Sequence, residues 1–73
     1  MAHPAYPTVP IAPLLEVVDG NQSELARQIG VGLRAVTRWC LKGVPEPSAD
    51  RAACALGYHP AELWGDAWWE AVA

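Results

Sequence analysis

The sequence predicts an all-α fold, a compact bundle of about five short helices, from three observations. Apolar residues recur at the three- and four-residue spacing of helices, and no segment alternates with the two-residue period of a strand. Glycines and prolines separate the periodic segments. The chain has 73 residues, of which 52% are apolar and 18% charged, so we expect one small globular domain.

Residues 1–9 contain Pro4 and Pro7 and show no periodicity, so we expect a flexible arm before a domain that spans residues 10–73. The first helix is predicted over residues 10–18, because proline is accepted in the first turn of a helix. The pair Asp19-Gly20 is expected to end it. Its predicted buried face consists of Ile11, Leu14, Leu15 and Val18.

Residues 21–43 predict two helices joined by a tight turn. Asn21 is a good N-cap for the first of them, and Glu24 three positions later completes the pattern of a capping box. Gly30 is expected to end this helix in the left-handed conformation, and Val31 to tuck between the two helices. The predicted inward residues are Leu25, Ala26 and Ile29.

The second helix of this pair is predicted over residues 33–41, and Gly43 follows it. Val36 and Trp39 would face inward, because they are three positions apart. The same helix would then carry Arg34, Thr37 and Arg38 outward.

Residues 48–73 are predicted to form the C-terminal helices, after a proline-stiffened linker over residues 43–47. Ser48 is the expected N-cap of a helix that ends at Gly57. His59 is expected to face solvent or to cap a following helix that has a proline in its first turn. The predicted inward residues of this half are Ala52, Ala53, Leu56, Leu63 and Trp64.

Trp68 and Trp69 are adjacent, and adjacent residues on a helix point about 100° apart. We therefore expect one of them to pack in the core. The other is expected to lie on the surface or to anchor a contact with a second copy of the chain, which makes a homodimer a prediction of this pair.

Charge is distributed unevenly along the chain, although the net charge is only −3. Residues 1–20 carry a net −2, residues 21–47 a net +2 and residues 48–73 a net −3. Four of the five cations therefore fall in the segment with the two paired helices. The four are Arg27, Arg34, Arg38 and Lys42. This asymmetry predicts one basic face on an acidic body, and Arg27 is expected to be a solvated charge or an ion-pair partner of Glu24.

Cys40 and Cys54 are too few for a disulfide framework, and we expect two buried or half-buried free thiols. Together with His3 and His59 they lack the spacing of a zinc site. No Ser or Cys has a base at a usable spacing, and no glycine-rich loop follows a strand. We therefore predict no enzyme activity, metal, cofactor or small-molecule substrate.

The segment NQSELARQIGV, followed by the inward Val36 and Trp39, resembles the helix-turn-helix of lambda-repressor/Cro-type (XRE-family) DNA-binding proteins. The resemblance spans roughly residues 11–64, because ADRAACALGYHPAELWG is similar to the supporting helices of that family. The arrangement GVP followed by AD, LG, HP and LWG looks most like small regulators of actinobacterial bacteriophages. The chain differs from the family at Gly32, where a capping Ser or Thr is usual, and at Leu33, where a polar base-reading residue is common.

The resemblance implies sequence-specific binding of double-stranded DNA by a transcriptional regulator of Cro or repressor type. The predicted recognition helix would enter the major groove, and two-fold dimers commonly read paired half-sites. The implied DNA-binding residues are Gln22, Gly32, Leu33, Arg34, Thr37, Arg38 and Lys42.

Two other functions fit the same sequence. A protein-interaction adaptor or antirepressor with this fold would have little DNA affinity, and the negative net charge, Gly32 and Leu33 favour it. An excisionase-like architectural protein often has a wing of strands, and the lack of a strand signal after the recognition helix counts against it. No membrane span is predicted, and without a signal-peptide pattern the expected location is the cytoplasm, of a bacterial host cell if a phage encodes the protein.

Overall fold

The computed structural model describes residues 7–72, and this part of the chain forms six short helices and two very short strands. The predicted all-α class is therefore confirmed, with one helix more than expected. In chain order the elements are β1 (Thr8–Val9), α1 (Ala12–Val17), α2 (Gln22–Ile29), α3 (Leu33–Lys42), β2 (Val44–Pro45), α4 (Glu46–Ala55), α5 (Pro60–Trp64) and α6 (Asp66–Val72).

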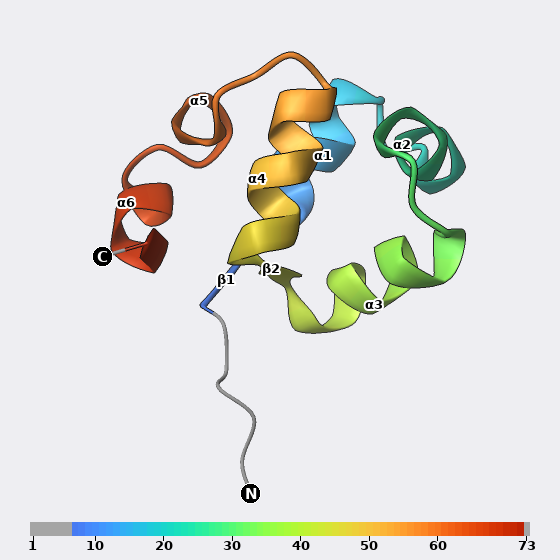
Figure 1. The fold of residues 1–73 in the computed structure, drawn as a ribbon. Helices are drawn as coiled ribbons and strands as arrows, with labels where there is room; N and C mark the ends of the chain where they lie inside the picture. Colours follow the sequence, from blue (N-terminus) through green and yellow to red (C-terminus); the bar gives the residue numbers. More distant parts are fainter. Residues whose placement is uncertain (1–6, 73) are drawn as a thin grey trace, which may run out of the picture.

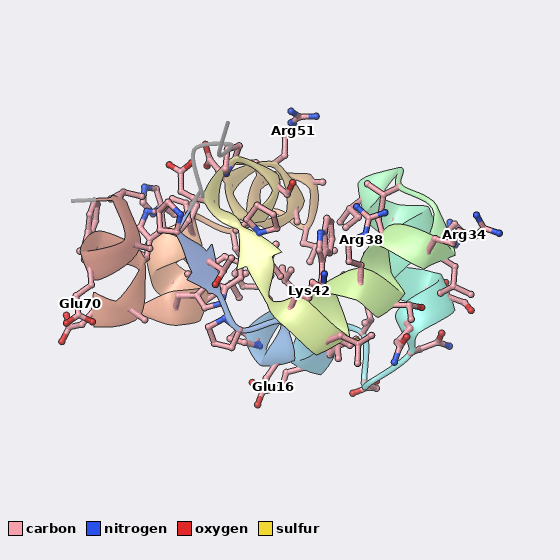
Figure 2. All side chains as sticks on the ribbon, turned by 90° about the horizontal axis from the view of Figure 1, so that it is seen from below. Glu16, Arg34, Arg38, Lys42, Arg51 and Glu70 are labelled. Carbon is pink, nitrogen blue, oxygen red and sulfur yellow. The ribbon has the colours of Figure 1, made fainter. Side chains whose placement is uncertain are left out.

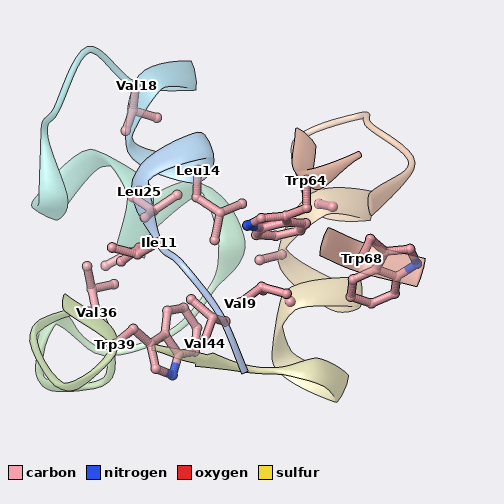
Figure 3. Close-up of a cluster of buried hydrophobic side chains, with 14 residues drawn as sticks. Val9, Ile11, Leu14, Val18, Leu25, Val36, Trp39, Val44, Trp64 and Trp68 are labelled. Carbon is pink, nitrogen blue, oxygen red and sulfur yellow. The ribbon is translucent and has the colours of Figure 1, made fainter. Parts of the chain in front are cut away.

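The helix α4 runs through the middle of the molecule, with α2 and α3 on one side of it and α5 and α6 on the other (Figure 1). A single core joins the two sides, and its largest completely covered side chains come from α1, α2, α3 and β2 (Figure 3). The tiny side chains of the inner face of α4 let the neighbouring helices approach it closely. That face consists of Ala49, Ala52 and Ala53.

The strand β1 corrects the prediction of a flexible arm over residues 1–9. Thr8 and Val9 pair antiparallel with Pro45 and Val44, respectively, and Val9 is buried. Pairing with β2 stabilises this segment because it buries an apolar side chain and satisfies backbone hydrogen-bonding groups together. Residues 1–6 of the predicted arm lie outside the described part of the chain.

Prolines set the starts of two helices differently from the prediction. The helix α1 begins at Ala12 instead of Pro10, with Pro13 in its first turn. The helix α4 begins at Glu46, so Ser48 lies inside the helix and is not its N-cap. Pro45 has the extended conformation of an N-cap residue, and Pro47 fits the first turn, where its missing N–H costs no hydrogen bond. The predicted linker over residues 43–47 is thus ordered as β2 and the start of α4.

The C-terminal helices are fixed to α1 and to each other through tryptophans. The Trp64 indole N–H donates to the Pro10 carbonyl at 2.7 Å. Trp68 is buried and stacks on Trp64, with 5.9 Å between the ring centroids. Trp69 is 55% exposed, so the prediction that the two neighbouring tryptophans separate into a core and a surface residue is confirmed.

His59 caps α5 as predicted. Its Nδ1 accepts a hydrogen bond from the Ala61 N–H at 3.0 Å, and the His59 N–H donates to the Glu62 carboxylate at 3.1 Å. Gly65 has a positive φ of 57° and separates α5 from α6. Among residues 7–72, no helix is long and apolar enough to cross a membrane.

Candidate functional site

The unit formed by α2, the following turn and α3 is built around Gly30. Gly30 has a φ of 75°, and its N–H bonds to the Ala26 carbonyl at 2.9 Å. The Val31 N–H bonds to the same carbonyl at 3.0 Å, which ends α2 and turns the chain into α3. The Val31 side chain is 36% exposed, so the prediction that it tucks between the helices is wrong. Figure 1 shows α2 nearly end-on while α3 runs across the view.

Asn21 caps α2 as predicted, because its side-chain oxygen accepts from the Glu24 N–H at 2.9 Å. The second half of the predicted capping box does not form. The Glu24 carboxylate instead accepts two hydrogen bonds from the Arg27 guanidinium and one from the Gln28 amide at 2.8 Å. The hydrogen bond from Arg27 is the main reason why the pKa of Glu24 is lowered to about 2, and the bond from Gln28 acts in the same direction.

The helix α3 has one buried and one exposed face, as predicted. Val36 and Trp39 are buried in the core. The exposed residues include all of those predicted to contact DNA from this helix, together with two that were not predicted to do so, Cys40 and Leu41. The full exposed set is Leu33, Arg34, Thr37, Arg38, Cys40, Leu41 and Lys42.

Two positions at the start of α3 limit its polar chemistry. Gly32 is the N-cap and supplies no side-chain hydrogen bond, as the sequence indicated. The Thr37 hydroxyl donates to the Leu33 carbonyl at 3.1 Å. In this rotamer, Thr37 offers its oxygen as an acceptor and its methyl group to the outside, and its hydroxyl proton is already used.

The cations of residues 7–72 fall into two groups, one that forms an ion pair and one that does not. Arg27 pairs with Glu24 on α2, and this is the one salt bridge within residues 7–72. Arg34, Arg38 and Lys42 of α3 therefore keep their charges available, and so does Arg51 of α4. Figure 2 shows these four side chains on α3 and α4, whereas Glu16 and Glu70 lie on other elements. The expectation that Arg27 pairs with Glu24 is confirmed, and Arg51 is a further unpaired cation beside those of α3 among residues 7–72.

Gln22 is exposed at the first position of α2. It lies on a different element from the other predicted contact residues, next to the N-terminus of that helix. The partial positive charge of a helix N-terminus favours an anionic partner at this position.

Two features of the surface were missed by the sequence reasoning. Leu41 is 81% exposed on α3, although its type suggested no role. Arg51 lines a small pocket between α4 and the turn after α2, although it belongs to the acidic C-terminal segment. The signal for Arg51 was available, because it is the single cation of residues 48–73.

Within residues 7–72, Cys40, Cys54 and His59 form no metal site. Cys40 and Cys54 are both exposed free thiols, so the expectation of buried or half-buried thiols is wrong. Cys40 lies within α3 and Cys54 within α4, and the Cys54 thiol lies 3.7 Å from an Asp50 carboxylate oxygen. No cluster of three potential ligands occurs in the described part of the chain, and His3 lies outside it.

Comparisons with protein-family models, with curated proteins and with solved structures found no match to this chain.

Proposed function

We propose that this protein is a transcriptional regulator of Cro or repressor type that binds double-stranded DNA sequence-specifically in the cytoplasm of a bacterial cell. The observation that carries the proposal is the exposed face of α3, where Arg34, Arg38 and Lys42 have no ion-pair partner among residues 7–72. Arginine and lysine side chains that keep their charges free on a helix after a tight turn suit the negatively charged major groove. The resemblance of residues 21–43 to XRE-family proteins supports the same function.

Each contact follows from the position of the side chain. Arg34 and Arg38 are one helical turn apart, so each can place its guanidinium against the O6 and N7 atoms of a guanine. Leu33 and the Thr37 methyl group suit the methyl groups of thymine. Gly32 allows the backbone to come close to the DNA. The remaining contacts are to phosphates, with Gln22 at the N-terminus of α2 and Lys42 at the end of α3.

A protein-interaction adaptor or antirepressor is the second candidate, and the exposed leucines favour it. Leu33 and Leu41 are 49% and 81% exposed on the same helix as the arginines. An adaptor could bury both leucines against an apolar partner, and it would not need a positive net charge. The winged, excisionase-like alternative has less support, because β2 follows α3 but pairs with β1 and so forms no wing hairpin.

Selection from a randomised pool of DNA duplexes at two salt concentrations tests the proposal. We expect enrichment of a motif that contains guanines, and Arg34→Ala and Arg38→Ala should each lower affinity about tenfold or more while relaxing the preference at one base pair. Arg27→Ala is the matched control, because it removes the same charge from a side chain that is already paired. If the wild-type protein enriches no sequence, the DNA-binding proposal is wrong and the adaptor function gains support.

A further inference from the structure

The pocket beside Arg51 is lined by residues from three neighbouring parts of the chain. The end of α2 and its turn supply one wall, Trp39 of α3 supplies the second, and α4 supplies the third. The complete lining consists of Ile29, Gly30, Val31, Trp39, Ser48, Arg51 and Ala52. The pocket therefore involves α3 through Trp39, the residue that follows Arg38 in the sequence.

The charge of this pocket is positive. Arg51 is its one charged lining residue, and it has no ion-pair partner among residues 7–72. Its neighbour Asp50 does not line the pocket and lies beside the Cys54 thiol instead. A second pocket, beside α1, has the opposite character, because Glu16 and Asp19 line it.

The size and the walls restrict what can enter. The volume is about 110 Å³, several times the about 10–15 Å³ that a cavity needs to hold one water molecule. The pocket therefore has room for a phosphate group and part of the adjoining sugar. Trp39, Val31 and Ala52 form an apolar part of the lining, which suits the CH groups of a sugar better than the hydration shell of a free anion.

We propose that this pocket binds one deoxyribose-phosphate unit of the DNA backbone beside the base pairs that α3 contacts. The inference rests on the proposed function and adds a contact that α3 itself does not supply. Arg51 pairs with the phosphodiester oxygens, and the Ser48 hydroxyl is the second polar group at the same pocket. Arg38 and Arg51 lie on the same side of the molecule in Figure 2, so one stretch of backbone can run past both.

The test is a salt titration of DNA affinity with the selected duplex, using the wild type, Arg51→Ala, Arg51→Lys and the charge-matched control Arg27→Ala. A phosphate contact carries no sequence information, so Arg51→Ala should weaken binding about tenfold for every base variant of the duplex. The slope of log K against log salt should fall by about one unit, and Arg51→Lys should keep that slope. Arg27→Ala should change affinity much less.

Nuclear magnetic resonance of the Trp39 indole N–H identifies the source of the phosphate. This signal should shift with the duplex and not with inorganic phosphate at millimolar concentration. A shift with inorganic phosphate alone, or an Arg51→Ala variant that behaves like Arg27→Ala, would overturn the backbone-binding site while leaving the DNA-binding function intact. A change of base preference in Arg51→Ala would show instead that Arg51 reads bases. If the wild type binds no duplex at all, both proposals fail together.

Discussion

Gly43 holds the sharpest local constraint in the chain, because it joins α3 to β2 in a conformation that other residues rarely adopt. Its φ is 88° and its ψ is 167°, and a Cβ there would lie 3.0 Å from both the Cβ and the Oγ1 of Thr8. Gly57 has the same φ of 88° but open space around the position of a Cβ. A substitution at Gly57 therefore causes backbone strain alone, whereas a substitution at Gly43 causes the same strain and a steric clash with Thr8.

We expect Gly43→Ala to lower the free energy of unfolding by about 3 kcal/mol and Gly57→Ala by about 1 kcal/mol. The difference arises because Thr8 would have to move away and disturb the pairing of β1 with β2. Urea unfolding monitored by circular dichroism measures both values. Equal losses of unfolding free energy in the two variants would mean that Thr8 and β1 can move away from position 43 without destabilising the protein.

The Trp64 indole supports the fold through its polar end as well as through its rings. Trp64→Phe keeps an aromatic ring near Trp68 but removes the donor to the Pro10 carbonyl. We expect a loss of about 2 kcal/mol in the free energy of unfolding. Trp69→Phe is the control and should change stability by less than about 0.5 kcal/mol, because Trp69 is largely exposed. The comparison uses the same urea titration, and similar values for the two variants would contradict the role of the hydrogen bond.

At the scale of elements, α2 carries a network of side chains whose strength depends on pH. The pKa of Glu24 is lowered from 4.5 to about 2, mainly by the hydrogen bond from Arg27. A carboxyl group with a lowered pKa in the folded state stabilises the protein above its unfolded pKa, and this contribution disappears as the pH falls through the folded pKa. The loss therefore belongs to the window from about pH 4.5 to about pH 2.

Melting temperatures of the wild type and Glu24→Gln over this range test the network. The wild type should be more stable above the window, and the two curves should converge toward its acid end as Glu24 becomes protonated. The exposed Glu70→Gln, which lies on α6, serves as the matched control. Parallel curves for the wild type and Glu24→Gln would show that the network adds nothing to folding.

The elements that could be predicted from the sequence are those fixed by neighbouring residues. Asn21, Gly30 and His59 act within a few positions along the chain, so their side chains or positive φ identify helix ends directly. The pairing of β1 with β2 joins Val9 to Val44 across the intervening helices, and a two-residue strand has no detectable period. The start of α4 was missed because Pro45 occupies its N-cap position and Pro47 its first turn, so that Ser48 lies inside the helix.

In the candidate site, too, the features fixed by nearby residues could be predicted and those fixed by contacts between distant residues could not. Helical spacing alone placed Arg34, Thr37 and Arg38 on the outer face of α3. The hydroxyl bond of Thr37 and the pocket at Arg51 depend on rotamers and on packing between elements, which the sequence does not contain. The exposure of Cys40 and Cys54 was misjudged because their type is usually buried, whereas the inner faces of α3 and α4 are already filled by other side chains.

At the scale of the whole molecule, the basic face and the exposed tryptophan lie on different parts of the surface. In Figure 1, α6 is on the opposite side of α4 from α2 and α3. Trp69 is 55% exposed there, and its ring centroid lies 6.0 Å from that of His59. A contact between two copies through α6 would therefore leave both α3 helices free for DNA.

This arrangement predicts opposite salt dependences for dimer formation and for DNA binding. A contact through α6 brings together acidic residues of both copies, Asp66 and Glu70, whose repulsion added salt screens. DNA binding should weaken with salt, because counterions compete for the phosphates. Sedimentation velocity at about 0.05 M and about 0.5 M salt should show more dimer at the higher concentration.

The variant Trp69→Ala should be monomeric at both salt concentrations and keep its helical circular dichroism, because Trp69 lies outside the core. It should also lose affinity for a duplex with two half-sites while keeping its affinity for a single half-site, since only the paired site depends on the dimer. A wild-type protein that stays monomeric at high salt and at high protein concentration would contradict a dimer through α6. The DNA-binding proposal would then apply to a monomer that reads one half-site.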